Sequence, residues 1–302
     1  MSAQERHRNL ASGPKPAGRW VDAALFARAL RCVRRRPGLR KFAFLAWATV
    51  RSFPYLRQGK DPSQFGEGAL LAQLTSKDRL YLDIGCNEPV RYNNTWLLRQ
   101  RGWRGWSVDA SDLHAPLWRI FRRKDRFLHR AVIAHRGADH VELFEFGPEY
   151  SLLSTTSVEQ LEAVAEANAN YRPVPIRVAA QHVEDLLKAF ETRWGRYPSL
   201  LLTDVEGLDW ALIEAAGPER LRERGVAFLL VEDLSPAHGA AASLPDPIDG
   251  GGSIDLSRLG EAGWSVLART GFSVLLTSRS TSSQCPDSNP GLGPMTPSLG
   301  GP

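Results

Sequence analysis

The sequence predicts an α/β fold whose mostly parallel sheet has about seven strands and ends in an antiparallel hairpin. Residues 80–108 have the layout of a βαβ unit, with an apolar strand, a short helix and a second apolar strand. Residues 200–204 form another apolar strand that ends in an acid. Two apolar strands within residues 264–277 flank the turn Arg269-Thr270-Gly271, which is typical of an antiparallel hairpin at the edge of a sheet.

The remaining elements follow from apolar periodicity and from turn residues. Strands are predicted at residues 80–84, 103–108, 127–134, 140–146, 200–204, 226–231, 264–268 and 272–277. Helices are predicted at residues 19–36, 68–74, 93–101, 113–123, 158–167, 181–190 and 209–215. The turn Arg136-Gly137-Ala138-Asp139 predicts that the strands on either side of it pair as a hairpin, and residues 171–178 are expected to be extended.

The composition divides the chain into three parts. Residues 1–66 are expected to form a basic, partly helical and partly disordered arm, residues 67–278 the globular domain, and residues 279–302, rich in Ser, Pro and Gly, a disordered tail. Residues 1–60 carry a net charge of +12 and the rest of the chain carries −7. We expect the arm to be solvated or packed on the domain, to lie on an anionic membrane, or to bind nucleic acid.

The sequence favours a cytoplasmic protein. Cys32, Cys86 and Cys285 have no paired spacing, so neither a disulfide framework nor a zinc site is predicted. The apolar run at residues 42–50 is far shorter than the roughly 20 residues of a membrane span, and the start of the chain lacks the pattern of a secretory signal. Peripheral membrane contact through residues 19–60 is a further expectation, and the Arg-rich start also resembles an organelle transit peptide.

Acids and a single glycine follow the first two strands of the βαβ unit. Asp83, Gly85 and Asn87 lie at the end of the first strand, and Asp109 ends the second. A dinucleotide site needs a glycine-rich turn, whereas this turn has one glycine and an acid, Glu88, that would repel phosphates. S-adenosylmethionine (SAM) has no phosphate and carries a sulfonium cation, so these residues favour it as the cofactor. The alternative is that the acids only cap helices.

A second group of acids follows the strand at residues 200–204. Asp204 and Glu206 would reach the same edge of a parallel sheet as Asp83, next to the transferred methyl group, unless they cap the following helix. His182 and His238 are further candidates for a general base. Three acids would be too few to predict a magnesium ion, and we predict no metal.

These motifs resemble those of the FkbM family of SAM-dependent methyltransferases. The resemblance rests on Asp83-Ile84-Gly85-Cys86-Asn87, on Gly102-Trp103-Arg104-Gly105 and on Asp204-Val205-Glu206-Gly207, and it covers residues 78–234. It implies the class I SAM-methyltransferase fold, which is Rossmann-like, and methyl transfer to a hydroxyl of a small molecule or a saccharide. It also implies that Asp83, Gly85, Asn87 and Asp109 bind SAM and that Asp204 and Glu206 lie at the methyl-transfer centre. The candidate catalytic residues are therefore Asp204 and Glu206, with His182 as a further candidate base for the hydroxyl proton. Pro89 and Thr203 depart from residues that are frequent in the family.

Two other hypotheses stay open. The chain could be an RNA methyltransferase that uses its basic arm to hold RNA, although nucleic acid is not the partner that we expect. It could also be a non-catalytic protein with a SAM-type fold, whose arm recruits a membrane or a protein partner. The acceptor, the general base and the oligomeric state are not determined by the sequence.

Overall fold

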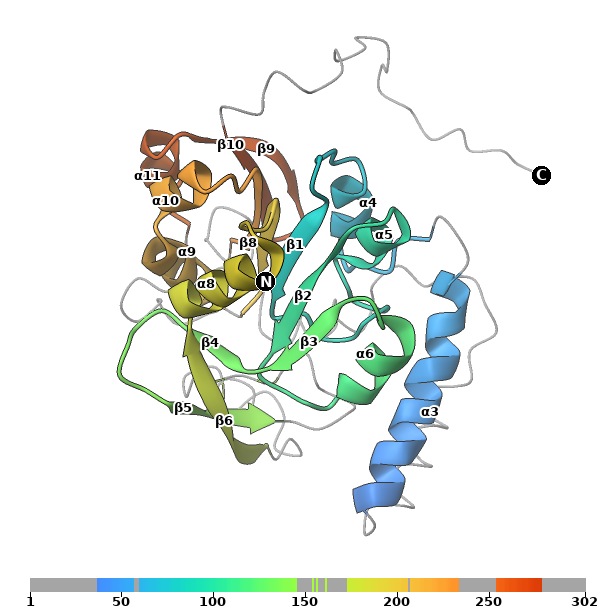
Figure 1. Ribbon diagram of the computed structural model, residues 1–302. Helices are drawn as coiled ribbons and strands as arrows, with labels where there is room; N and C mark the ends of the chain where they lie inside the picture. Colours follow the sequence, from blue (N-terminus) through green and yellow to red (C-terminus); the bar gives the residue numbers. More distant parts are fainter. Residues whose placement is uncertain are drawn as a thin grey trace, which may run out of the picture.

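The computed structural model describes residues 37–56, 60–145, 173–205, 207–233 and 254–278, together with residues 154, 156 and 161 (Figure 1). The predicted helices at residues 19–36 and 158–167, the predicted tail, Glu206 and His238 lie outside the described residues.

A seven-stranded sheet in the order β3-β2-β1-β7-β8-β10-β9 forms the centre of the fold (Figure 1). Its strands are β1 (Leu80–Ile84), β2 (Arg104–Asp109), β3 (Arg126–His129), β7 (Leu200–Thr203), β8 (Phe228–Glu232), β9 (Trp264–Thr270) and β10 (Ser273–Ser278). Pairing is parallel from β3 to β8, and β10 is antiparallel to both β8 and β9. The predicted α/β class, mostly parallel sheet and terminal hairpin are confirmed, and the arrangement is compatible with a Rossmann-like fold.

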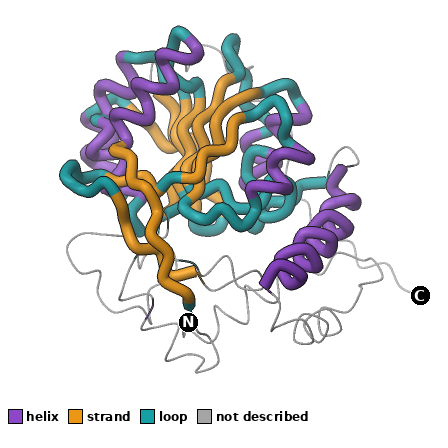
Figure 2. Tube along the Cα trace, turned by 60° about the horizontal axis from the view of Figure 1, so that its bottom comes forward, coloured by secondary structure: helices purple, strands orange, loops and turns teal. Residues whose placement is uncertain are grey.

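Helices cover both faces of this sheet (Figure 2). On one face lie α8 (Val183–Trp194), α9 (Asp209–Ala216), α10 (Pro218–Glu223) and α11 (Leu256–Glu261), whose apolar residues form one core with Leu80, Leu82 and Ile84. On the other face lie α4 (Glu67–Leu71), α5 (Trp96–Gln100) and α6 (Ala115–Phe121). Leu71 and Leu98 of this layer pack on Tyr81. Alternate residues of β1 thus enter different layers, which explains why its whole sequence is apolar up to Asp83.

A second, three-stranded sheet has the order β4-β6-β5, and it corrects one prediction. Its strands are β4 (Ala131–Ile133), β5 (His140–Glu145) and β6 (Val174–His182). The predicted hairpin is wrong, because β6 lies between its two strands, parallel to β4 and antiparallel to β5. The predicted strand at residues 127–134 is also divided: its first half, in β3, pairs with β2 in the central sheet. Alternating residues indicated strands here, but they did not identify the partners.

Within the basic arm, one helix is described, α3 (Pro37–Leu56), and it packs on α6. Phe44 and Ala48 of α3 form a small buried cluster with Leu113 and Leu117. Among the described residues, no helix has the length and the apolar character needed to cross a membrane.

Candidate functional site

The carboxyl ends of β2, β1 and β7 lie side by side, so three of the predicted acids come from adjoining strands. The backbone N–H of Gly85 donates to the carbonyl of Val108 at 2.9 Å, and that of Asp204 donates to the carbonyl of Ile84 at 2.9 Å. Strand ends held this closely bring Asp83, Asp109 and Asp204 to one edge of the sheet, which is the edge where open α/β sheets bind ligands.

Gly85 is required by the packing of this edge. Its φ angle is +85°, and a Cβ atom added to it would stand 1.9 Å from the carbonyl oxygen of Asp204. Any side chain would therefore both strain the backbone and push the turn after β1 away from the end of β7. Gly85, which is expected to bind the cofactor, is therefore required for a structural reason as well. It allows the turn after β1 to contact the end of β7.

Asp109 holds the turn that follows β1. Its two carboxylate oxygens accept backbone N–H groups, Oδ2 from Asn87 and Oδ1 from Ser111, each at 2.8 Å. Asn87 adopts a positive φ of 48°, and its carbonyl accepts a hydrogen bond from Trp118 Nε1 at 2.9 Å. Burial raises the pKa of Asp109, and the two N–H donors oppose that rise. Each oxygen keeps a second lone pair with which it can accept a hydroxyl of a ligand.

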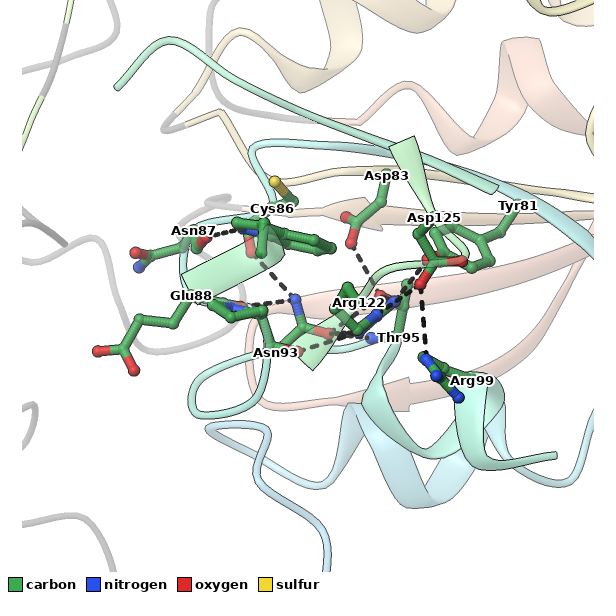
Figure 3. A network of polar contacts seen from close by, with 12 residues as sticks. Tyr81, Asp83, Cys86, Asn87, Glu88, Asn93, Thr95, Arg99, Arg122 and Asp125 are labelled. Carbon is green, nitrogen blue, oxygen red and sulfur yellow. Dashed lines mark hydrogen bonds and ion pairs between the residues drawn. The ribbon is translucent and has the colours of Figure 1, made fainter. Parts of the chain in front are cut away.

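Asp83 points into a buried polar network (Figure 3). It is 3% exposed, and its Oδ2 accepts a hydrogen bond from the Thr95 hydroxyl at 3.1 Å. The Thr95 hydroxyl in turn accepts one from Arg122 Nη2 at 3.0 Å. Burial raises the pKa of Asp83 to about 7, against the opposing effects of Arg122 and Thr95. This surrounding gives Asp83 the role of supporting the turn from inside the domain.

Arg122, which the sequence analysis did not single out, is the centre of that network. Its Nε donates to Asp125 at 2.6 Å, its Nη1 to the carbonyl of Pro89 at 3.0 Å and to Asn93 Oδ1 at 3.1 Å, and its Nη2 to the Tyr81 hydroxyl at 2.5 Å (Figure 3). The side chains of Arg122 and Asp125 are both fully buried. A basic residue near the end of a predicted helix is ordinarily explained by the helix dipole, so no sequence signal marked it.

Asn93 and Thr95 belong to the segment that was predicted as the start of a helix. Asn93 Nδ2 donates to the carbonyls of Cys86 at 3.1 Å and Glu88 at 2.8 Å, and Asn93 Oδ1 accepts the backbone N–H of Thr95 at 3.1 Å. These side chains stabilise an irregular turn, which explains why α5 begins only at Trp96.

Glu88 brings a buried carboxylate to the turn. Its nearest described cation is Arg91, at 3.6 Å from Oε1, and both side chains are 7% exposed. Its Oε2 is buried and has no hydrogen-bond partner within the described ranges. Burial raises the pKa of Glu88, with Arg91 and then Arg51 opposing. The side chains of Glu88 and Asn87 both point away from the Arg122 network (Figure 3). A buried oxygen without a donor is a group that a cationic ligand can satisfy.

The acids after β7 divide into an exposed and a buried residue. The side chain of Asp204 is exposed at the end of the strand, and Glu206 lies outside the described residues. Asp209, at the start of α9, is buried and accepts the backbone N–H of Val205 at 3.3 Å. Burial raises the pKa of Asp209 to about 6, with the Thr203 hydroxyl and backbone N–H groups opposing. Asp209 therefore stabilises the turn and leaves Asp204 as the described acid that faces outward.

His182 caps a helix instead of facing the acids. It is the N-cap of α8, and its Nδ1 accepts the backbone N–H of Glu184 at 3.3 Å. Its Nε2 lies 2.8 Å from the carbonyl of Ala134, an acceptor to which only a protonated nitrogen can donate. Both ring nitrogens of His182 therefore have partners within the fold, so we no longer propose His182 as the general base.

The described part of the chain also has a hollow away from this edge. A hollow of about 610 Å³ lies at the opposite, amino ends of β1 and β2 and is lined by Leu74, Thr75, Ser76, Lys77, Arg79, Arg101 and Trp103. It contains none of the acids discussed above. In the part of the chain that the structure describes, no three His, Cys, Asp or Glu side chains are grouped as metal ligands. No family model matches the chain, and comparison with curated proteins also gives no match, so the assignment of function rests on the residues of the site.

Proposed function

We propose that the protein is a SAM-dependent O-methyltransferase, similar to the FkbM family, that methylates a hydroxyl of a small molecule or a saccharide. The observation that carries this proposal is the meeting of the carboxyl ends of β1, β2 and β7, where a turn with a single glycine is bound to Asp109. The seven-stranded sheet with its antiparallel terminal hairpin is the layout expected for the class I SAM-methyltransferase fold.

The residues at this edge fit SAM better than a dinucleotide. Asp109 has lone pairs left for the two ribose hydroxyls, while its backbone bonds hold it in place. The buried Oε2 of Glu88 suits the cationic groups of SAM and disfavours a pyrophosphate. When bound, SAM supplies an electrophilic methyl group on its sulfonium.

Asp204 is the described residue best suited to take the proton of the acceptor hydroxyl. It is exposed, it adjoins Gly85 through its own carbonyl, and its strand ends next to β1. Alignment of the hydroxyl supplies much of the rate in such a displacement, and a base adds typically about 10²–10⁴-fold. Glu206, two residues further on, remains the alternative base.

Calorimetry with SAM tests the cofactor. Asp109→Ala should weaken SAM binding by about tenfold or more, because two hydrogen bonds of roughly 1 kcal/mol each are lost. Asp139→Ala is a matched control, since that acid is exposed in the loop before β5. Absence of heat with the parent protein, or unchanged affinity of Asp109→Ala, would contradict the proposal.

Mass spectrometry of a metabolite extract treated with the protein and SAM tests the reaction. The parent should add one methyl group to a hydroxyl compound. Asp204→Asn should keep its SAM affinity and lose about 10²–10⁴-fold in turnover if Asp204 is the base. Methylation by Asp204→Asn at the parent rate would move the role to Glu206.

An RNA methyltransferase is the second candidate, because residues 1–60 carry a net charge of +12. Residues 1–36 can be deleted without touching α3, which packs on the domain. Salt-sensitive RNA binding that disappears with this deletion would favour the RNA hypothesis over a small acceptor.

A further inference from the structure

Helix α3 is apolar on two opposite faces, and one of them packs against the domain. Phe44 and Ala48 are 1% and 0% exposed and lie against Leu113 and Leu117. The carboxyl-terminal end of the helix is held as well, because the Tyr55 carbonyl accepts a hydrogen bond from Trp96 Nε1 at 3.0 Å. The orientation of α3 on the domain is therefore determined by buried contacts at both ends.

The other face of α3 carries large apolar side chains in solvent. Phe42, Val50 and Phe53 are 69%, 57% and 56% exposed, and Ala46 between them is exposed too. At 100° per residue these four positions fall within an arc of about 80°, opposite the buried face, and they span about 16 Å along the helix. We call Phe42, Ala46, Val50 and Phe53 the outer stripe. Helix α3 lies on the outer side of α6 in both views (Figures 1 and 2).

The chain segment that carries the outer stripe is basic in sequence, and at 100° per residue the three basic positions of α3 fall on the side of the helix away from the stripe. Helix α3 contains Arg40, Lys41 and Arg51 and no acid. The first 60 residues, to which it belongs, have a net charge of +12, whereas the rest of the chain has −7. A partner that covers the outer stripe must bury apolar side chains, and negative charge on that partner would attract the basic arm to which the stripe belongs.

We propose that the outer stripe docks α3 in the plane of an anionic lipid bilayer. Such a surface takes apolar side chains below its headgroups and attracts basic segments at the same time. A second copy of the chain would bring two arms of the same sign together, which opposes association. Nucleic acid would use the charge, but it would leave the aliphatic part of the stripe exposed. This docking is independent of the proposed methyl transfer.

Sedimentation of the full chain with vesicles tests the docking. The protein should bind vesicles of phosphatidylcholine with phosphatidylserine, and bind those of phosphatidylcholine alone much less. The triple variant Phe42→Ser, Val50→Ser, Phe53→Ser should bind the anionic vesicles at least tenfold more weakly. The burial of a single, partly inserted Phe side chain already strengthens binding by roughly tenfold. Either Phe replaced singly by Ser should already weaken binding about threefold to tenfold.

A matched control variant replaces three exposed apolar residues on strands away from α3: Val174→Ser, Val266→Ser and Leu267→Ser, which are 61%, 46% and 42% exposed. It should sediment like the parent. The proposal is overturned if the outer-stripe variants bind anionic vesicles like the parent, if the parent binds no vesicles, or if both lipid compositions bind equally. It is also overturned if the stripe variant abolishes self-association or RNA binding while vesicle binding is unchanged.

Discussion

Replacement of Arg122 by Met tests whether the buried network holds the turn of the site. Methionine keeps the length of the side chain but removes every donor, so the buried carboxylate of Asp125, the Tyr81 hydroxyl and the Pro89 carbonyl all lose a partner. Removing one member of a buried ion pair costs about 3–5 kcal/mol, because a charge is left unpaired away from water. For a domain of this size the loss should lower the Tm by about 10 °C.

The measurement is the free energy of unfolding from chemical denaturation. Arg99→Met is the matched control, because Arg99 Nε approaches the same oxygen of Asp125, but at 3.9 Å and with its side chain 30% exposed. We expect that control to cost less than about 1 kcal/mol, because the contact is long and Asp125 keeps its ion pair with Arg122.

A double variant separates the unpaired charge from lost packing. Arg122→Met combined with Asp125→Leu removes both charges and should be less destabilised than Arg122→Met alone. If Arg122→Met stays within about 1 kcal/mol of the parent, or if the two replacements are additive, the network does not hold the turn as described.

Three further outcomes test individual residues. Asp83 has a pKa of about 7 in the folded protein and of about 3.9 in the unfolded chain. Between these pH values the folded protein holds a proton on Asp83 that the unfolded chain has lost. The stability of the protein should therefore fall as the pH rises from about 4 to about 7. Chemical denaturation at a series of pH values measures the free energy of unfolding. Relative to the parent, that of Asp83→Asn should rise by up to about 4 kcal/mol from pH 4 to 7. If the difference between variant and parent does not change with pH, the raised pKa of Asp83 is contradicted. Gly85→Ala should lower the free energy of unfolding by more than about 2 kcal/mol, because the added Cβ meets the carbonyl of Asp204. Gly137→Ala is the control: Gly137 also has a positive φ, but nothing lies within 4 Å of its added Cβ, so it should cost about 1 kcal/mol. Equal losses would show that the contact with Asp204 is unimportant. His182→Ala should lower stability by about 1 kcal/mol and His182→Asn should restore it, with methyl transfer unaffected by either; a loss of turnover in both folded variants would return His182 to catalysis.

The central sheet could be predicted because its strands are buried on both faces. Such strands appear as apolar runs, and β1, β7 and β8 were found with bounds within two residues of those observed. The three-stranded sheet could not be predicted in the same way. The partner of β4 and β5 is β6, more than 25 residues beyond β5 along the chain, and alternation carries no information about which strand pairs with which.

The candidate site was likewise only partly accessible to sequence reasoning. The sequence predicts Asp109 and Asp204 as site residues because acids at strand ends have a recognisable position. The support of the site was not identified, since Arg122 is 41 residues from Tyr81 and 27 from Thr95. His182 shows that sequence alone does not separate two roles, because a histidine before a helix can cap it as readily as it can act as a base.

Local patterns by themselves determined which segments are strands, where their acidic ends lie and which end of the chain is basic, because apolar periodicity, turn residues and charge are local properties. Tertiary structure decided which of those acids is enclosed and which faces outward, as Asp83 and Asp204 illustrate. It also decided that one face of α3 is covered and the opposite one exposed. Burial depends on what distant segments pack against a residue, and that packing is settled only when the whole chain folds.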